Sequence, residues 1–552
     1  AGNPNIFGFL DTTGISGLNT TANWRHIFNQ RVNLNLGYQF SRFAVRTVPF
    51  FAAIRRNVSG DAGITGNNQE PGNWGPPSLS FASGIQGLSD SQASVIRNQT
   101  HALSANLLWV HRPHNLTLGM DYRRQQFDLL SQQDPRGSFT FNGAATQTGA
   151  NGTGFDFADF LLGIPDTSSI AFGNADKYFR ASSWDAYFTD DWRIGPSLTF
   201  NAGVRWEYGS PITEKYGRLV DLDIAPGFSA AAPVVANNPT GTLTGHQYPG
   251  SLVQPDRHGF EPRISFAWHP FFGSSMVIRG GYGVYYNSSV YQAIAIQMAQ
   301  QSPLSKSLSV ADGPANPLTL ASGFNAAPGN TPNTFAIDPN FLAGYAQNWQ
   351  LSVQRDLFES MVATATYLGI KGTRAVHVFL PNTYPIGAAN PCPTCPSGFA
   401  YMTSNGNSTR EAGQFQLRRR LHNGFTASVQ YTYAKAFDNA ALGGRGQGTS
   451  VMAQNWLDLS AERGPSSFDQ RHQLTLQGQF TTGIGVGGGT LLRGWKGAAF
   501  KGWTFVSQIT AGSGMPLTPT YLAAVMGSGV TGPLRPDVTG ASVYAAPSGR
   551  FL

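Results

Sequence analysis

The sequence predicts an all-β fold, a transmembrane antiparallel up-and-down β-barrel with short turns at one end and long loops at the other. Three observations support this prediction: a composition poor in charge, hairpins that alternate between apolar and polar residues, and connections that alternate between short and long. About fourteen strands are recognisable from the alternation. Together these features indicate strands that place one face against lipid.

The composition argues against a set of soluble domains. Charged residues make up 12% of the 552 residues, about half the usual share, whereas aromatic residues reach 12% and glycines number 65. No apolar run approaches the ~18 residues that a transmembrane helix needs. Three classes remain: an outer-membrane barrel, a secreted all-β protein and a fibrous glycine-rich assembly. The mean hydropathy of −0.20 suits a barrel, because inward polar residues offset outward apolar ones.

The clearest hairpin is Ser182–Tyr208. The apolar face of its second strand carries Leu198, Phe200, Ala202, Val204, Trp206 and Tyr208. This alternation covers about eleven residues, the length that crosses a bilayer as a tilted strand. The first strand runs through Trp184, Ala186, Phe188 and Trp192, and Ile194–Ser197 forms the turn.

Six further strand pairs follow the same pattern. They are 18–27 with 31–42, 98–110 with 115–127, 262–268 with 276–286, 347–354 with 361–370, 415–421 with 425–435, and 472–480 with 503–511. In six successive pairs, short connections within the pairs alternate with much longer ones between them, whereas the last pair, 472–480 with 503–511, flanks a glycine-rich connection. Bacterial outer-membrane barrels have short periplasmic turns and long extracellular loops, whereas soluble sandwiches mix loop lengths at both ends. We therefore expect the apolar faces to meet lipid.

This arrangement assigns places to particular side chains. Trp192 at the turn end, and Trp206, Tyr208 and Tyr286 at the loop end, are expected in the aromatic girdles at the two membrane interfaces. The alternative is that they are core aromatics of a soluble sandwich. A lumen-facing polar wall is expected from Asp121, Arg123, Arg205 and Glu207. Such a wall would line a translocation path, grip a plug, or simply solvate the lumen.

The two cysteines, Cys392 and Cys395, are expected to form a small disulfide that braces a loop. Two cysteines are too few for a zinc site, which needs four ligands, and the Pro-rich surroundings do not match a thioredoxin-like motif. The net charge of +7 is spread along the chain, and its densest cluster, Arg418–Arg420, lies within a strand pattern. We expect basic residues near strand ends to meet lipid head groups rather than nucleic acid.

No catalytic constellation is evident, so an enzyme is not expected, and neither a cofactor nor a metal site is predicted. The glycine run 483–489 lacks the following helix and the acidic residue of a nucleotide-binding motif. Neither a Gly-x-Ser-x-Gly elbow nor a His-Glu-x-x-His motif occurs. Asp190 and Asp191, beside a turn and next to Trp192, are interpreted as an interfacial charged cap.

Several short sequence motifs resemble those of a known protein family. Asp190–Arg193 and Leu198–Arg205 resemble the barrel hairpin of TonB-dependent outer-membrane receptors. Other phrases resemble the Oar-like subgroup of that family: Glu261–Trp268, Arg279–Tyr286, Tyr367–Gly372, Tyr431–Lys435, Glu462–Pro465 and Phe468–His472. Each phrase is weakly specific alone, but their order and spacing from about residue 16 to residue 536 are specific together.

The resemblance implies a location in the bacterial outer membrane, about 22 strands, and energy-coupled passage of an unidentified ligand. It implies outer-membrane lipid, lipopolysaccharide and the TonB complex as partners, with the long loops meeting the ligand first. The family's plug, TonB-box and N-terminal regulatory-like domain are not recognisable here, and the C-terminus lacks a final amphipathic strand. We therefore expect residues 1–552 to be an incomplete barrel. A scaffold barrel in an envelope assembly and a passive porin-like channel remain as alternatives.

Overall fold

In the computed structural model, two compact units account for the chain. The first comprises Ala1–Ile264, Gly283–Ala343 and Thr394–Pro396, and the second comprises Ser265–Tyr282, Gly344–Pro393 and Ser397–Leu552. The structure describes residues 10–517, 521–522 and 533–534, except 148–153, 272–273, 314–316, 326–334, 359, 382, 385–386, 391–392, 394–398, 423, 440–451, 454, 484–490 and 493. Cys392 and Cys395, with their expected disulfide, lie outside the described residues.

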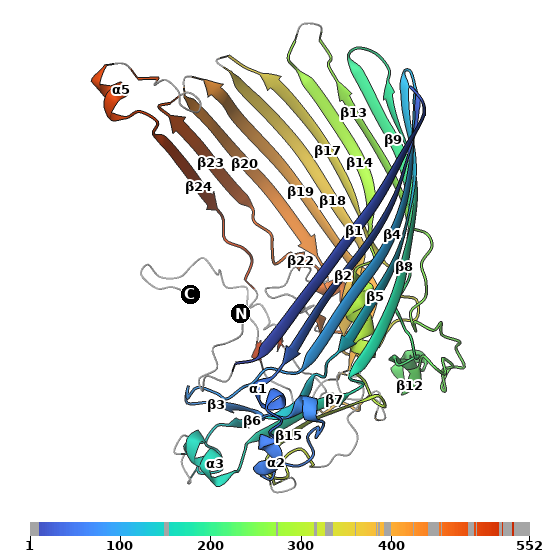
Figure 1. The fold of residues 1–552 in the computed structure, drawn as a ribbon, viewed down its shortest axis with the longest axis vertical. Helices are drawn as coiled ribbons and strands as arrows, with labels where there is room; N and C mark the ends of the chain where they lie inside the picture. The colour runs from blue at the N-terminus through green and yellow to red at the C-terminus, as the bar shows by residue number, and fades with distance from the viewer. Residues whose placement is uncertain are drawn as a thin grey trace. The chain divides into compact units, whose positions relative to one another are not determined.

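Long antiparallel strands dominate both units (Figure 1). In chain order they are β1 (Thr12–Asn29), β2 (Val32–Val48), β4 (Ser94–His111), β5 (His114–Leu130), β8 (Asp176–Arg193), β9 (Leu198–Gly209), β13 (Phe260–Trp268), β14 (Val277–Asn287), β17 (Gly344–Asp356), β18 (Met361–Phe379), β19 (Ala400–His422), β20 (Phe425–Asp438), β23 (His472–Thr481) and β24 (Thr504–Gly512). Both strands of each of the seven predicted pairs are therefore present, and the antiparallel sheet is confirmed.

Each long strand pairs mainly with its neighbours in sequence. In the first unit the antiparallel ladders join β1 to β2, β2 to β4, β4 to β5, β5 to β8 and β8 to β9. In the second unit they join β17 to β18, β18 to β19, β19 to β20, β20 to β23 and β23 to β24. This order is an up-and-down meander, as the alternation of short and long connections predicts.

The long strands of the first unit expose apolar side chains and cover polar ones. Met120 on β5 is 58% exposed and Leu118 is 56% exposed, whereas Asp185 on β8 is only 6% exposed. Because residues that face each other in register lie on the same face of a sheet, the ladders divide this sheet into an apolar face and a polar face. The apolar face contains Tyr122, Trp184 and Tyr208 in one row, and the polar face contains Asp121 and Asp185.

Glycines let aromatic rings lie across neighbouring strands at two places. A Cβ atom at Gly119 on β5 would collide with the ring of Tyr187, its partner on β8. A Cβ atom at Gly369 on β18 would collide with the ring of Trp349, its partner on β17. Each glycine therefore leaves the space that the partner ring fills, an arrangement that supports strand register.

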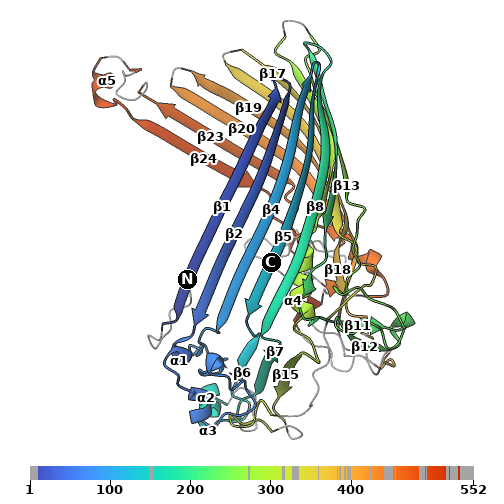
Figure 2. The ribbon, with the colours of Figure 1, turned by 45° about the vertical axis from the view of Figure 1, so that its right-hand side comes forward.

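The loop ends of β2, β4, β5 and β8 lead into a smaller sheet of the first unit (Figures 1 and 2). It consists of β3 (Ser78–Phe81), β6 (Asp134–Phe141), β7 (Thr167–Gly173) and β15 (Ser305–Ala311). Its core contains Phe139, Phe141, Ile170 and Phe324, each at most 1% exposed. Arg136 and Asp90 form an ion pair of 2.6 Å at the edge of this small sheet, and both side chains are nearly inaccessible.

The remaining elements are short. The helices are α1 (Phe50–Ala53), α2 (Val58–Asp61), α3 (Asp156–Leu162), α4 (Val290–Met298), α5 (Trp495–Ala499), and the 3-10 turns η1 (Pro71–Asn73), η2 (Pro226–Phe228) and η3 (Leu459–Glu462). The minor strands are β10 (Thr213–Glu214), β11 (Val220–Ile224), β12 (Ala231–Val235), β16 (Phe335–Ile337), β21 (Met452–Ala453), β22 (Gly464–Pro465), β25 (Tyr521–Leu522) and β26 (Pro533–Leu534). Within the described residues, none of the helices has both the length and the apolar character to traverse a membrane.

Candidate functional site

Strand register brings acidic side chains of three strands into one row on the polar face. Asp121 on β5 lies opposite Asp185 on β8, and Asp185 lies opposite Glu207 on β9. Arg205 is two residues from Glu207 on the same strand and therefore lies on the same face. Arg123 stands in the same relation to Asp121. The four predicted wall residues thus share one face, together with Asp185.

Arg205 is the centre of this polar wall, which we define as Asp121, Arg123, Asp185, Arg205 and Glu207. One guanidinium nitrogen, Nη2, lies 2.9 Å from Asp185 Oδ2, and Nε lies 3.6 Å from Glu207 Oε2. The side chain of Asp185 is only 4% exposed, whereas those of Arg205 and Glu207 are each 25% exposed. Because burying an unpaired carboxylate is strongly unfavourable, the contact with Arg205 offsets part of the free-energy cost of burying Asp185.

A tyrosine extends the polar wall toward the short-turn end of the strands. The guanidinium of Arg205 lies 5.6 Å from the ring centre of Tyr187, within the range of a cation–π contact. The Tyr187 hydroxyl donates a hydrogen bond to Asn106 Oδ1 on β4. Asp185, Tyr187 and Asn106 were not among the predicted wall residues. The alternation of Trp184, Ala186 and Phe188 was the signal that could have placed Asp185 and Tyr187 on the polar face.

At the loop end, the polar face continues onto β13. Glu261 is 2% exposed, receives the backbone N–H of Tyr286 at 2.8 Å and contacts Arg263 Nη2 at 2.6 Å. Tyr286, Tyr291 and Glu207 line a cavity of about 20 Å³. Burial raises the pKa of Tyr291, which lies on α4, to about 12. Tyr291 is therefore a neutral hydroxyl at physiological pH.

The four predicted interface aromatics occupy different surroundings. Trp192 stacks on the ring of His114 at 5.3 Å, beside the short turn. Trp206 stacks on Tyr208 at 6.3 Å, and its Nε1–H donates to the carbonyl of Arg257 at 2.9 Å. Tyr286 donates to the carbonyl of His258 at 3.2 Å. Their role at a membrane interface stays a prediction.

The polar wall can bind and orient polar groups through its paired charges. Among the described residues, no group of three or more His, Cys, Asp or Glu side chains is arranged to hold a metal ion. Paired charged side chains of both signs are suited to contact with water, ions, a polar ligand or a docked polar protein surface.

Long antiparallel strands with one apolar and one polar face are typical of the β-barrels of the bacterial outer membrane. The chain belongs to the family described as "Outer membrane beta barrel domain", which it matches over residues 1–550. None of the curated proteins matches the chain.

Among solved structures, similar chains come from outer-membrane transporters. The outer membrane transporter YddB from Escherichia coli has a TM-score of 0.47 and 11% identity, covering 85% of this chain and 49% of its own. The ferric-catecholate import receptor Fiu from Escherichia coli K12 has a TM-score of 0.44 and 10% identity, covering 85% and 52%. The FrpB iron transporter from Neisseria meningitidis has a TM-score of 0.40 and 11% identity, covering 91% and 57%. The chain spans about half the length of the first two.

Proposed function

We propose that this barrel is the membrane-spanning part of a TonB-dependent receptor that binds a ligand at its long loops and moves it past the polar wall. The observation that supports the proposal is the ion pair of Asp185 and Arg205 on the polar face, because the polar face of an outer-membrane barrel strand is the one expected to face the lumen. The sequence motifs Asp190–Arg193 and Leu198–Arg205, which resemble the barrel hairpin of TonB-dependent receptors, support the proposal that transport depends on TonB. The Oar-like subgroup is part of the same proposal.

The gene provides the first test. Under the proposal, the reading frame on the N-terminal side of Ala1 encodes a plug and a TonB-box. A reading frame without either segment would contradict active transport. Co-purification of the protein with other envelope subunits in a fixed stoichiometry would instead favour the alternative function, a scaffold barrel in an envelope assembly.

Ion conductance in planar bilayers tests the polar wall and separates the receptor from a passive channel. We expect the full-length protein to show no steady conductance, because the plug fills the lumen. Steady conductance by the full-length protein would establish the porin-like alternative.

The isolated chain of 552 residues is expected to conduct and to prefer cations, because acidic groups outnumber basic ones along the polar wall. Asp185→Asn combined with Glu207→Gln should shift this preference toward anions. Asp190→Asn is the matched control, since Asp190 lies on the opposite face of β8 and contacts His114 at 2.7 Å. An equal shift in both variants would contradict the assignment of the polar wall to the lumen.

A further inference from the structure

The polar face of the first unit contains a small cavity near the loop ends of β4, β5 and β8. Its volume is about 190 Å³, and its lining includes Thr100 on β4, Gln125 on β5, Ala181 on β8 and Gln292 on α4. Register sets Thr100 opposite Gln125, and Gln125 opposite Ala181. Gln125 is four residues from Asp121 on the same strand. The cavity therefore lies on the face of the polar wall, about 13 Å nearer the long loops.

The segment that leads into α4 lies on this same face. A Cβ atom at Gly209 on β9 would be 2.6 Å from the side chain of Ser288, just before α4. Gly209 is two residues from Glu207 and therefore points to the same side of the sheet. Gln292, on the first turn of α4, is exposed and borders the cavity together with Ile212. The cavity is thus enclosed between the sheet and elements of the long loops.

The polar side chains at the cavity carry no charge. They are the amides of Asn98, Gln125 and Gln292 and the hydroxyl of Thr100. Among the residues that the structure describes, none of these four side chains has a hydrogen-bond partner. Each amide offers two donor hydrogens and one acceptor oxygen, and the hydroxyl both donates and accepts. The cavity therefore presents free donors and free acceptors side by side.

Two aromatic rings form much of the apolar part of the lining. Phe127 on β5 faces Phe179 on β8, and their rings stack with centroids 5.8 Å apart. Phe179 is only 1% exposed, whereas Phe127 is partly exposed. A partly exposed ring beside uncharged amides suits a ligand that has an apolar face and a polar rim.

The charged side chains in and near the lining are bound to other groups. Arg180, which also lines the cavity, donates from Nη1 to Asp128 Oδ1 at 2.6 Å. Glu214 on β10 accepts from Arg218 Nη2 at 3.2 Å. Arg123 belongs to the polar wall and lies on the side away from the long loops. In the described lining, therefore, no charge is left to pair with an ionic ligand, and burying an unpaired ionic group is unfavourable.

We propose that this cavity binds one neutral sugar ring of a glycan that passes through the barrel. The inference rests on the proposed function, because it names the class of ligand that meets the cavity before the polar wall. Sugar hydroxyls both donate and accept, so they match Thr100, Gln125 and Gln292, while the C–H face of the ring packs on Phe127. The volume is below the ~300 Å³ of pockets for drug-sized ligands, which fits one ring of a longer chain.

Isothermal titration calorimetry of the full-length protein tests the site, in a detergent without a sugar head group. The probes are three neutral trisaccharides, maltotriose, cellotriose and xylotriose, at up to millimolar concentration. At least one of them should bind. Gln125→Ala/Gln292→Ala should bind it about 25-fold more weakly, because each lost hydrogen bond between neutral groups corresponds to roughly a factor of five. Failure of all three trisaccharides to bind would overturn the proposal.

The matched control is Asn115→Ala/Gln297→Ala. It removes one exposed amide from the polar face of β5 and one from α4, both outside the lining of the cavity. It should change trisaccharide binding less than about twofold, since neither amide reaches the bound ring. Unheated gel migration checks that both double variants fold. An equal loss of affinity in the two double variants, or a loss in neither, would place the sugar elsewhere and overturn the proposal.

Two further probes identify what is recognised. Trigalacturonic acid carries a carboxylate on every ring, and N-acetyl-triglycine amide is a neutral peptide of similar length. Both should bind much more weakly than the best trisaccharide. Equal binding of the acid would show that neutrality is not selected, and equal binding of the peptide would show that a sugar is not. Either result contradicts the proposal.

The sugar site and the proposed function fail separately. If the protein bound a trisaccharide but its reading frame encoded neither plug nor TonB-box, active transport would be wrong and the sugar site would stand. If both segments were encoded and no trisaccharide bound, the sugar site alone would be wrong.

Discussion

The first unit contains two β-sheets that bury opposite kinds of side chain. In the small sheet β3–β6–β7–β15, Phe139 and Phe141 are fully buried, as in any water-soluble domain. In the long strands, Leu118 and Met120 are more than half exposed, whereas Asp185 and Glu261 are almost fully buried. The two sheets are consecutive in one chain, since β5 leads directly into β6.

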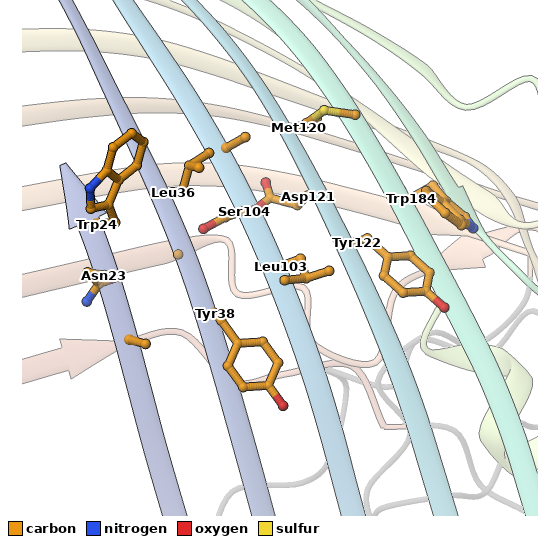
Figure 3. A pocket seen from close by; sticks show the side chains of 13 residues that line it. Asn23, Trp24, Leu36, Tyr38, Leu103, Ser104, Met120, Asp121, Tyr122 and Trp184 are labelled. Carbon is orange, nitrogen blue, oxygen red and sulfur yellow. The ribbon is translucent and has the colours of Figure 1, made fainter. Parts of the chain in front are cut away.

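This difference indicates two environments for one chain. The small sheet hides its apolar side chains from water, because burial of apolar surface is what stabilises it. The long strands present theirs to the surroundings, which is favourable only where those surroundings are lipid. The boundary between the two environments therefore falls between the small sheet and the level of Tyr122 and Trp184 on the long strands (Figure 3).

The largest expected effect comes from the core of the small sheet. Phe139→Ala should destabilise this sheet by about 3–5 kcal/mol, because it removes a fully buried ring and leaves a cavity. Limited proteolysis should show faster cleavage within β6 and β7, while the long strands still migrate as a folded barrel on an unheated gel. The control Phe157→Ala removes a ring that is 39% exposed and should have a much smaller effect. Loss of the folded gel band in Phe139→Ala would show that the two sheets are not independent.

A smaller effect is expected on the apolar face of the long strands. Leu118 lies on β5 midway between the positions that face Trp192 and Trp184 on β8. Leu118→Arg should therefore destabilise the membrane-inserted chain by about 2–4 kcal/mol, because arginine there faces hydrocarbon. The urea midpoint of folding in lipid vesicles measures this change. Thr117→Arg is the control, since Thr117 lies on the polar face. If the two variants unfolded at the same urea concentration, the division into two faces would be wrong.

The smallest effect, measured between pH 7 and 9, concerns a buried acid in the β11–β12 hairpin. Burial raises the pKa of Asp221 to about 8, although Oδ1 accepts the backbone N–H groups of Leu222 and Ile337 at 2.8 and 3.0 Å. The folded state therefore holds this proton more tightly than the unfolded state does. The stabilisation is fully present below about pH 4 and is lost as pH rises through about 8, and the last part of this loss, about 1 kcal/mol, falls between pH 7 and 9.

Hydrogen exchange of the β11–β12 hairpin at several pH values, corrected for the intrinsic rate, measures this slope. Asp221→Asn keeps an oxygen acceptor without a titrating proton and should abolish it. A slope that persists in Asp221→Asn would assign the pH dependence to another group.

The sequence was sufficient to predict the seven hairpins and their order, because strand alternation and turn spacing are local properties. The segment Phe157–Gly163 fits a helical turn and a short strand about equally well from its sequence, and the structure shows helix α3 there. The stretch 43–96 has no sustained alternation, yet β2 continues to Val48 and β3 pairs within the small sheet. That sheet joins residues as distant as Phe139 and Phe324, a contact that no local pattern reveals.

The candidate site was predicted only in part. Asp121, Arg123, Arg205 and Glu207 were recognised from their alternation along single strands. Asp185 was missed because its importance depends on the register of β8 against both β5 and β9, which decides that it faces Arg205.

The glycine–aromatic pairs have a consequence for assembly. If β8 slipped by one residue against β5, Tyr187 would face a residue with a side chain, and its ring would lose the space above Gly119. The same slip would turn Asp185 toward lipid, on the face opposite to Asp121 and Arg123. The two glycine–aromatic pairs, Gly119 with Tyr187 and Gly369 with Trp349, therefore favour the correct register of their strand pairs. A strand pair in the wrong register is disfavoured before the sheet is complete.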